Sequence, residues 1–268
     1  MAAHLVADIG GTNGRFALAG NEASPLVLPV AGYGVALDLI RDSHRRLGAP
    51  AIDAISIAAA GPIDRKSVRL TNGSLVFRAD EIGAAFGGIP VRVFNDLQAA
   101  ALALPGLGPG DLLCIGPGRE PDFRHPVALA NVGTGLGVSC LIPGIADGIP
   151  ALATEGGHAT LAAGNATERH ILAGLETRFG HVSAERVLSG EGLRNLHHAM
   201  TDGQDCAPGK IVEAALSGEA IATATLTQFT AFLGTFAGNL ALIYGAWGGV
   251  FIGGGIPPRF ADFLAASP

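Results

Sequence analysis

The chain has 268 residues, of which 49% are hydrophobic and 15% are charged, and its formal net charge is −6. A chain of this length and apolar content can bury a substantial core, which argues against a largely disordered protein. The acidic balance provides no positive field for a nucleic-acid backbone or an anionic membrane surface, so we expect neither as a partner.

The cysteines and the first residues indicate a compartment. Cys114, Cys140 and Cys206 are far apart and odd in number, which fits neither a disulfide framework nor a paired-cysteine zinc site. Residues 1–8 contain an acid too early, and too short an apolar run, for a secretory signal. We therefore expect a cytoplasmic protein.

The first part of the chain predicts alternating strands and helices. In order, we expect a strand at 4–9, a Gly10-Gly11 turn, a strand at 15–19, a short apolar stretch at 26–30, an amphipathic helix at 35–47, a strand at 54–60, a loop or strand edge at 71–77, a strand at 90–94 and a helix at 97–104. Proline and glycine then become frequent over 105–126, which indicates a hinge. We place the division between two domains there, as 1–105 and 106–268.

The second part of the chain begins with the same pattern of elements as the first. A strand at 127–131, a Gly133-Thr134-Gly135 turn and a strand through 138–142 repeat the strand, glycine turn, strand pattern of the N-terminus. Two such units predict a duplicated architecture in which both halves offer a backbone loop to one ligand. After it we expect helices at 166–179, 190–200, 210–216 and 219–245, and a strand at 249–252.

One stretch has the composition of a membrane span. Residues 220–258 carry no charged side chain, and 229–247 is long enough to cross a bilayer. Threonines and Asn239 recur through it, however, and no Lys/Arg cluster flanks it. We therefore predict a buried core helix and no membrane association.

Glycine-rich turns supply candidate phosphate sites. In Asp8-Ile9-Gly10-Gly11-Thr12-Asn13, the glycines open backbone N–H groups to phosphate oxygens, Thr12 adds a donor, and Asp8 can hold Mg²⁺ through water. An ordinary hairpin turn has the same composition and remains an alternative. The turn Gly133-Thr134-Gly135 offers the same chemistry to a second phosphate, and the run Gly253-Gly254-Gly255 can let the ribose or base of a nucleotide lie against the backbone. Each could instead be structural glycine, and their spacing fits neither a P-loop nor a dinucleotide-binding fingerprint.

Several motifs, taken together, are similar to one family. In order and spacing the chain resembles the bacterial glucokinases, of the sugar kinase, heat-shock protein and actin superfamily, at 8–15, Asn95-Asp96, 133–138, 155–158, 181–190 and 253–257. The resemblance covers essentially the whole chain. It implies a two-domain α/β fold of the actin-like ATPase (ribonuclease H-like) class with an interdomain cleft, with glucose and ATP as substrates, Mg²⁺ as cofactor and a homodimer as the assembly.

The resemblance also assigns roles to residues. It makes Asp96 the general base for the terminal hydroxyl of the sugar, a role that suits a carboxylate. Sugar-binding residues would be Asn72, Asn95, Asp96, Glu155, His158 and Glu185. Nucleotide-binding residues would be Asp8, Gly10, Gly11, Thr12, Asn13, Gly133, Thr134, Gly135, Gly253, Gly254, Gly255 and Ile256.

Simpler roles exist for some of these residues. Asn95 or Asp96 could instead cap the helix that begins near Leu97. Glu155 and Glu185 could be surface acids; with His158 they lack the helical spacing of a zinc site. A related branch of sugar kinases and repressors has a cysteine-rich zinc motif, for which this chain has no counterpart.

Two departures from the family keep other functions open. Leu75 stands where the family usually has tryptophan, which changes the expected packing at the edge of the sugar. The sequence ends at Pro268, where family members continue through another strand and a closing helix. A non-catalytic sugar-binding relative of the kinases, or a kinase of another hexose, therefore remains an alternative to a glucokinase.

Overall fold

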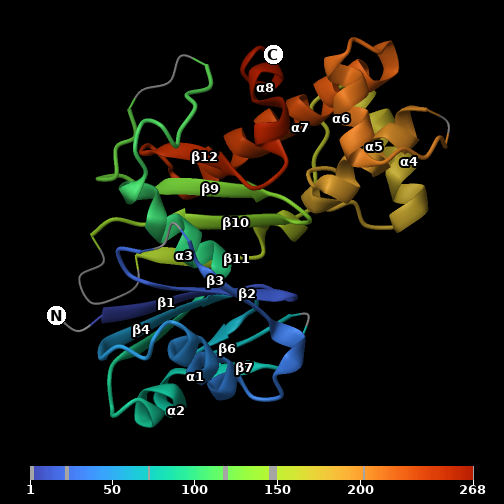
Figure 1. The fold of residues 1–268 in the computed structure, drawn as a ribbon. Coiled ribbons are helices and arrows are strands. Elements are labelled where there is room, and N and C mark those ends of the chain that lie inside the picture. The colour runs from blue at the N-terminus through green and yellow to red at the C-terminus, as the bar shows by residue number, and fades with distance from the viewer. Residues whose placement is uncertain are drawn as a thin grey trace. The chain divides into compact units, whose positions relative to one another are not determined.

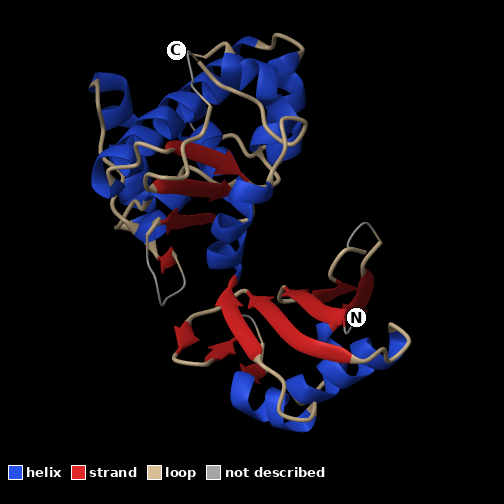
Figure 2. Ribbon diagram, turned by 90° about the vertical axis from the view of Figure 1, so that its left-hand side faces the viewer, coloured by secondary structure: helices blue, strands red, loops and turns tan. Residues whose placement is uncertain are grey.

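The computed structural model describes residues 3–21, 24–71, 73–116, 120–144, 150–201 and 203–267. The chain divides into two compact units, residues 1–100 and 101–268, and each is an α/β unit with its own hydrophobic core (Figures 1 and 2). The division falls inside helix α3 (Asp96–Ala103), ahead of the segment rich in proline and glycine.

The first unit is built on a five-stranded sheet in the order β3-β2-β1-β4-β8. Neighbours β3, β2 and β1 run antiparallel, whereas β4 and β8 continue the sheet parallel to β1. These strands are β1 (Ala3–Ile9), β2 (Asn13–Leu18), β3 (Leu26–Pro29), β4 (Ile52–Ala59) and β8 (Val91–Asn95). A small sheet of β5 (Ile63–Asp64), β6 (Ser67–Arg69) and β7 (Val76–Arg78) accompanies it, with helices η1 (Val30–Gly32), α1 (Ala36–Arg46) and α2 (Ala79–Ala85).

Alternation of apolar side chains places the core of this unit. Leu5 and Ile9 of β1 and Ile55 and Ile57 of β4 point to one face of the sheet and are at most 1% exposed. Helices α1 and α2 lie on one side of this sheet, as Figure 2 shows, and α1 contributes Leu39 and Ile40 to the same core, because these two positions share its apolar face.

The second unit repeats this arrangement. Its four-stranded sheet has the order β11-β10-β9-β12, with the first three strands antiparallel and β12 parallel to β9. The strands are β9 (Val127–Val132), β10 (Leu136–Leu141), β11 (Ala151–Thr154) and β12 (Gly249–Gly253). The helices are η2 (Leu104–Gly106), η3 (Gly156–His158), α4 (Ala166–Phe179), η4 (Ala184–Arg186), α5 (Gly190–Met200), α6 (Pro208–Leu216), α7 (Ala220–Tyr244), η5 (Pro257–Phe260) and α8 (Ala261–Ala265).

The two strand orders confirm the predicted duplication. Strands β3-β2-β1-β4 of the first unit correspond to β11-β10-β9-β12 of the second, with the same directions in each. The glycine turns that follow β1 and β9 therefore occupy equivalent positions in their own sheets.

Helix α7 is the predicted apolar helix. Of the described residues, it alone forms a helix long and apolar enough to cross a membrane, with a mean hydropathy of 1.3 and 39% of its most apolar window buried. Phe229, Phe232 and Leu233 are fully buried in the core of the second unit, which confirms the predicted core helix. The opposite side of its last turns is exposed, at 83% for Leu242 and 73% for Ile243.

Candidate active site

The hairpin β1–β2 presents the first glycine turn. Its register pairs Asp8 with Arg15, and Arg15 Nη1 donates a hydrogen bond to Asp8 Oδ2 over 3.2 Å. The turn is closed by the Gly10 N–H, which donates to the Asn13 carbonyl over 2.9 Å. The residues between them, Gly11 and Thr12, are exposed, so that their backbone is accessible to a ligand.

At the start of α3, the neighbouring polar residues Asn95 and Asp96 make different contacts. Asn95 Oδ1 accepts the N–H groups of Leu97 at 3.0 Å and Gln98 at 3.3 Å, and its Nδ2 donates to the Gly61 carbonyl at 3.0 Å. Asn95 is thus the residue that caps the helix. Asp96 also accepts the Leu97 N–H, through Oδ1 at 3.0 Å.

The electrostatic environment of Asp96 favours a role as a general base. Partial burial raises the pKa of this carboxyl above its ordinary value, and the nearby negative charge of Asp8 adds to the rise. The hydrogen bond from the Leu97 backbone acts in the opposite direction but does not cancel it. A half-buried carboxylate with a raised pKa is a stronger proton acceptor than a solvated one.

Asn72 and Leu75 are the two other positions of the first unit that the sequence analysis linked to the sugar. Asn72 lies outside the described residues. Leu75, the position of the family's tryptophan, is 2% exposed and packs in the core of the first unit with Leu70 and Phe77. Leu75 itself has almost no exposed surface, and the expected change of packing at the edge of the sugar stays a prediction.

The second glycine turn lies beside two other backbone segments. Gly190, the first residue of α5, donates its N–H to the Gly133 carbonyl over 2.9 Å, and Ile256 donates to the Val132 carbonyl over 3.2 Å. The start of α5 is capped by Ser189, whose Oγ accepts the Gly192 N–H. A helix N-terminus carries partial positive charge, so this end of the sheet suits an anion.

The run Gly253-Gly254-Gly255 lies beside the second glycine turn because its backbone approaches β9 closely. Gly254 has a φ of +97°, and a Cβ added there would lie 2.2 Å from the Val132 carbonyl oxygen. Only glycine allows the chain to turn back so closely on β9. The structure therefore brings together the two predicted nucleotide segments of this unit, 133–135 and 253–256.

Three predicted sugar residues also come together. His158 Nε2 lies 3.7 Å from Glu155 Oε2, and His158 Nδ1 lies 3.9 Å from Glu185 Oε1. The imidazole thus stands between two carboxylates. The side chains of Glu155 and His158 are 83% and 60% exposed, and that of Glu185 is 34% exposed, so all three are accessible to a ligand.

Local backbone contacts explain this arrangement. The helix η3, which carries His158, can pack on β10 because Gly157 has no side chain: an added Cβ would lie 1.9 Å from the Leu136 carbonyl oxygen. The segment after His158 then pairs with the segment before Glu185, through the bridge between Thr160 and Ser183. This pairing places Glu185 beside His158 although the two are far apart in sequence.

Glu185 has a second contact that the sequence analysis missed. Its Oε2 accepts the N–H of Leu136, the residue that follows the second glycine turn, over 2.9 Å. Gly135 makes room for it, since a Cβ at that position would lie 2.5 Å from the same oxygen. One carboxylate therefore contacts both the candidate sugar site and the candidate phosphate loop. No local sequence signal links residues so distant.

These features define a class of protein: a sugar kinase of the actin-like ATPase fold. The solved structures agree, because a ROK hexokinase from Thermus thermophilus superposes with a TM-score of 0.69 over 98% of this chain and 85% of that chain, at 20% identity, which shows the shared fold. The crystal structure of a glucokinase from an Antarctic psychrotroph is much closer, with a TM-score of 0.88 and 36% identity over 100% of this chain and 87% of that chain.

Sequence comparison gives the particular family. A profile of the glucokinase family matches residues 5–268. Glucokinases of Paramagnetospirillum magneticum and Chromobacterium violaceum are 44% and 43% identical, over 98% of this chain and over 85% and 78% of their own lengths. The chain belongs to the glucokinase family.

Proposed function

We propose that this protein transfers the γ-phosphate of ATP to the 6-hydroxyl of D-glucose, with Asp96 as the general base (EC 2.7.1.2). Membership of the glucokinase family supports the substrates. The observation that carries the chemical role is the setting of Asp96, a half-buried carboxyl whose pKa is raised while its neighbour Asn95 caps the helix.

Asp96 would accept the hydroxyl proton as the phosphoryl group arrives. Phosphoryl transfer requires little covalent chemistry from the protein, so positioning of the substrates and stabilisation of charge contribute most of the catalysis. Asp96 would use Oδ2 for the substrate, since the backbone hydrogen bond from Leu97 goes to Oδ1. That backbone bond also fixes the orientation of the carboxylate.

Glu155, His158 and Glu185 would bind the sugar hydroxyls, together with Asn95 and Asn72. Carboxylates accept hydrogen bonds from neighbouring hydroxyls, and an imidazole can donate or accept. A sugar that lacks one of these hydroxyls would leave a polar group unpaired, which is the basis of selectivity at such a site.

The glycine turns would hold the nucleotide. Residues Gly10, Gly11, Thr12 and Asn13 of one unit and Gly133, Thr134 and Gly135 of the other would bind phosphate oxygens, and Gly253, Gly254, Gly255 and Ile256 would flank the adenosine. The N-terminus of α5 supports this assignment, because it lies against Gly133 and its partial positive charge favours phosphate.

Asp8 would position Mg²⁺ through a bound water. Its carboxylate is a hard oxygen ligand, its side chain is 56% exposed, and Arg15 takes only one of its two oxygens, so the residue fits a water-mediated magnesium contact. When bound, Mg²⁺ would neutralise charge on the phosphates. Within the described ranges, no three or more His, Cys, Asp or Glu side chains gather to hold a metal ion directly.

The test is a substrate panel. We expect this chain to form ADP from Mg-ATP when glucose is added, and much more slowly with mannose, galactose or N-acetylglucosamine. Faster turnover of another hexose would replace the proposed substrate. Glucose binding without ADP formation would instead favour a non-catalytic sugar-binding protein. We also propose that the enzyme is cytoplasmic and that it forms a homodimer. Gel filtration with light scattering would check the homodimer.

A further inference from the structure

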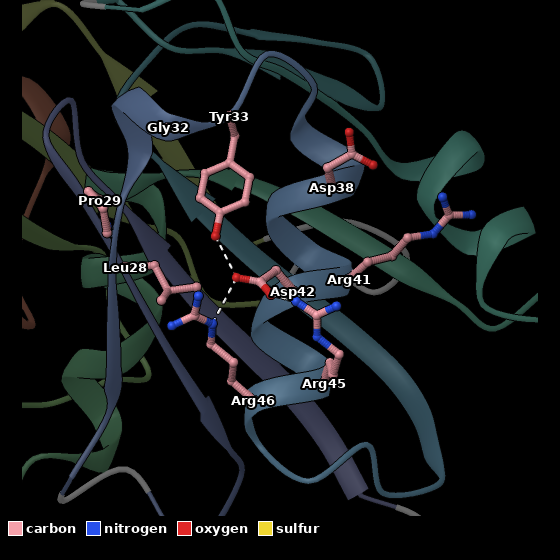
Figure 3. Close-up of a pocket in the computed structure, with 9 residues that line it drawn as sticks. All are labelled: Leu28, Pro29, Gly32, Tyr33, Asp38, Arg41, Asp42, Arg45 and Arg46. Carbon is pink, nitrogen blue, oxygen red and sulfur yellow. Dashed lines mark hydrogen bonds and ion pairs between the residues drawn. The ribbon is translucent and has the colours of Figure 1, made fainter.

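A hollow on the first unit has no role in the proposed reaction. It has a volume of about 830 Å³ and lies between β3, η1 and α1 (Figure 3). Its volume is in the range of small-molecule sites. On the side of β3 the hollow is lined by Pro29, which is exposed, and by Leu28, which packs in the core and is only 3% exposed; polar side chains of α1 face them.

The charges that line the hollow are mainly positive. Arg41, Arg45 and Arg46 all lie on it, against the acids Asp38 and Asp42. The hollow thus has one more basic than acidic side chain, whereas the chain as a whole has 17 basic residues against 23 acidic ones. A local cluster of guanidinium groups in an otherwise acidic protein favours an anionic ligand.

Asp42 holds two of these arginines in place. Its carboxylate accepts the Tyr33 hydroxyl at 2.6 Å and Arg46 Nε at 2.9 Å, and it also accepts a bond from Arg45 Nη2 (Figure 3). The Asp42 side chain is only 11% exposed, whereas those of Arg45 and Arg46 are 76% and 55% exposed. The hydrogen bond from Tyr33 and the two arginines keep the pKa of Asp42 below its ordinary value.

The arginines have more donors than this contact uses. A guanidinium has several N–H donors in a planar fork that matches phosphate oxygens. Asp42 takes one nitrogen from each of Arg45 and Arg46. Arg41 makes no ion pair or side-chain hydrogen bond within the described residues, and Figure 3 shows it extended away from Asp42. Its donors, and the remaining donors of its two neighbours, are available to a ligand.

The wall of the hollow is joined to the first glycine turn. Strand β3 pairs with β2 so that Pro29 lies opposite Asn13, and the N–H of Val30 donates to the Thr12 carbonyl over 2.8 Å. Tyr33 follows directly after η1, on the same short segment. Arg46 and Tyr33 share the Asp42 carboxylate, so a ligand that holds Arg46 would also restrain the segment that carries Tyr33 and supports Thr12.

We propose that this hollow binds a small phosphate monoester through Arg41, Arg45 and Arg46, with its carbon skeleton against Pro29. Bound there, the ligand stabilises one arrangement of the 10–13 turn and thereby changes the affinity for ATP. The binding site stands on the geometry of the first unit alone. The effect on ATP rests on the proposed function.

The first experiment measures binding directly. Inorganic phosphate and glycerol 3-phosphate are titrated by calorimetry into the chain saturated with glucose and a non-hydrolysable ATP analogue, which keeps the candidate active site filled. We expect both to bind, glycerol 3-phosphate more tightly. Because each charge-assisted hydrogen bond is worth roughly a factor of ten or more, Arg41→Ala and Arg46→Ala should each weaken binding at least about tenfold.

Arg92→Ala is the matched control. Arg92 is an exposed arginine of β8 in the same unit, it does not line the hollow, and its loss should leave binding unchanged. Arg41→Ala guards against a folding effect, since Arg41 makes no contact with Asp42 that its loss would break. No binding to the unaltered chain would overturn the proposal, and so would equal affinity in Arg41→Ala and Arg92→Ala.

The second experiment tests the link to ATP. We expect saturating glycerol 3-phosphate to change KM for ATP in the unaltered chain and in Arg92→Ala, and to have no effect in Arg41→Ala. Binding without any change in KM would keep the site and remove the link. Absence of kinase activity would contradict the proposed function, while the calorimetry would still decide the site.

Discussion

Replacing Glu185 should impair ATP and glucose together. In Glu185→Ala the Leu136 N–H loses its acceptor, and Leu136 is only 4% exposed, so water cannot easily take the place of the carboxylate. A hydrogen bond to a charged group contributes about 1.5–3 kcal/mol, and we take the lower end because a third of the Glu185 side chain is exposed. At about 1.4 kcal/mol per factor of ten, this predicts a roughly tenfold rise in KM for ATP, in addition to weaker glucose binding.

Glu155→Ala is the matched control for this prediction. Glu155 lies on the other side of His158, its side chain is 83% exposed, and no side-chain contact to the glycine turn is found for it among the described residues. Its loss should raise KM for glucose and leave KM for ATP nearly unchanged. Steady-state kinetics with each substrate varied at saturation of the other would show the difference. Equal KM values for ATP in the two variants would refute a role for Glu185 in holding the turn.

Three other changes have defined outcomes. Gly157→Ala should lower the thermal midpoint, with a loss of about 1–3 kcal/mol from overpacking, because the new Cβ would meet the Leu136 carbonyl; an unchanged midpoint would show that η3 shifts freely. The acid limb of kcat/KM should lie above the ordinary pKa of an aspartate because the pKa of Asp96 is raised, and Asp8→Asn should move that limb to lower pH by removing one cause of the rise; no movement would contradict the coupling. The pKa of Asp42 is lowered in the folded state, so its contribution to stability is present above the unfolded-state pKa and is lost as the pH falls through the folded-state pKa. Asp42→Asn removes this contribution. The free energy of unfolding in urea should therefore depend less on acid pH in Asp42→Asn than in the unaltered chain.

The main elements of the fold could be predicted from local pattern. Strands such as β1 and β4 alternate in hydrophobicity, and the helices α4 and α5 have caps, Asn165 and Ser189, that mark where they begin. The duplicated turn was visible because glycine and threonine recur after an apolar strand in both halves. Its meaning became clear only from the strand order, which the sequence does not state.

Most of the short elements were missed for a physical reason. The small sheet β5–β7 and strand β11 contain two to four residues each, too few to show a period, and they form because neighbouring strands pair with them. Helix α2 begins directly after β7, without a side-chain cap to mark it. In these places long-range packing determines the structure.

The candidate site shows the same limit. The resemblance to the glucokinase family indicated Asp96, His158 and Glu185, and the structure brings the last two together through the bridge between Thr160 and Ser183. The bond from Leu136 to Glu185 and the arginine hollow could not be foreseen, since both join segments whose approach depends on the folded backbone.

The central claim is that Asp96 removes the proton from the glucose hydroxyl. The most direct measurement compares ADP formation and glucose binding in the unaltered chain and in Asp96→Asn, which keeps the shape of the side chain and removes its basicity. We predict that kcat falls by about 10²–10⁴-fold while glucose still binds within a few-fold of its original affinity. Turnover that is unchanged in Asp96→Asn would contradict the account.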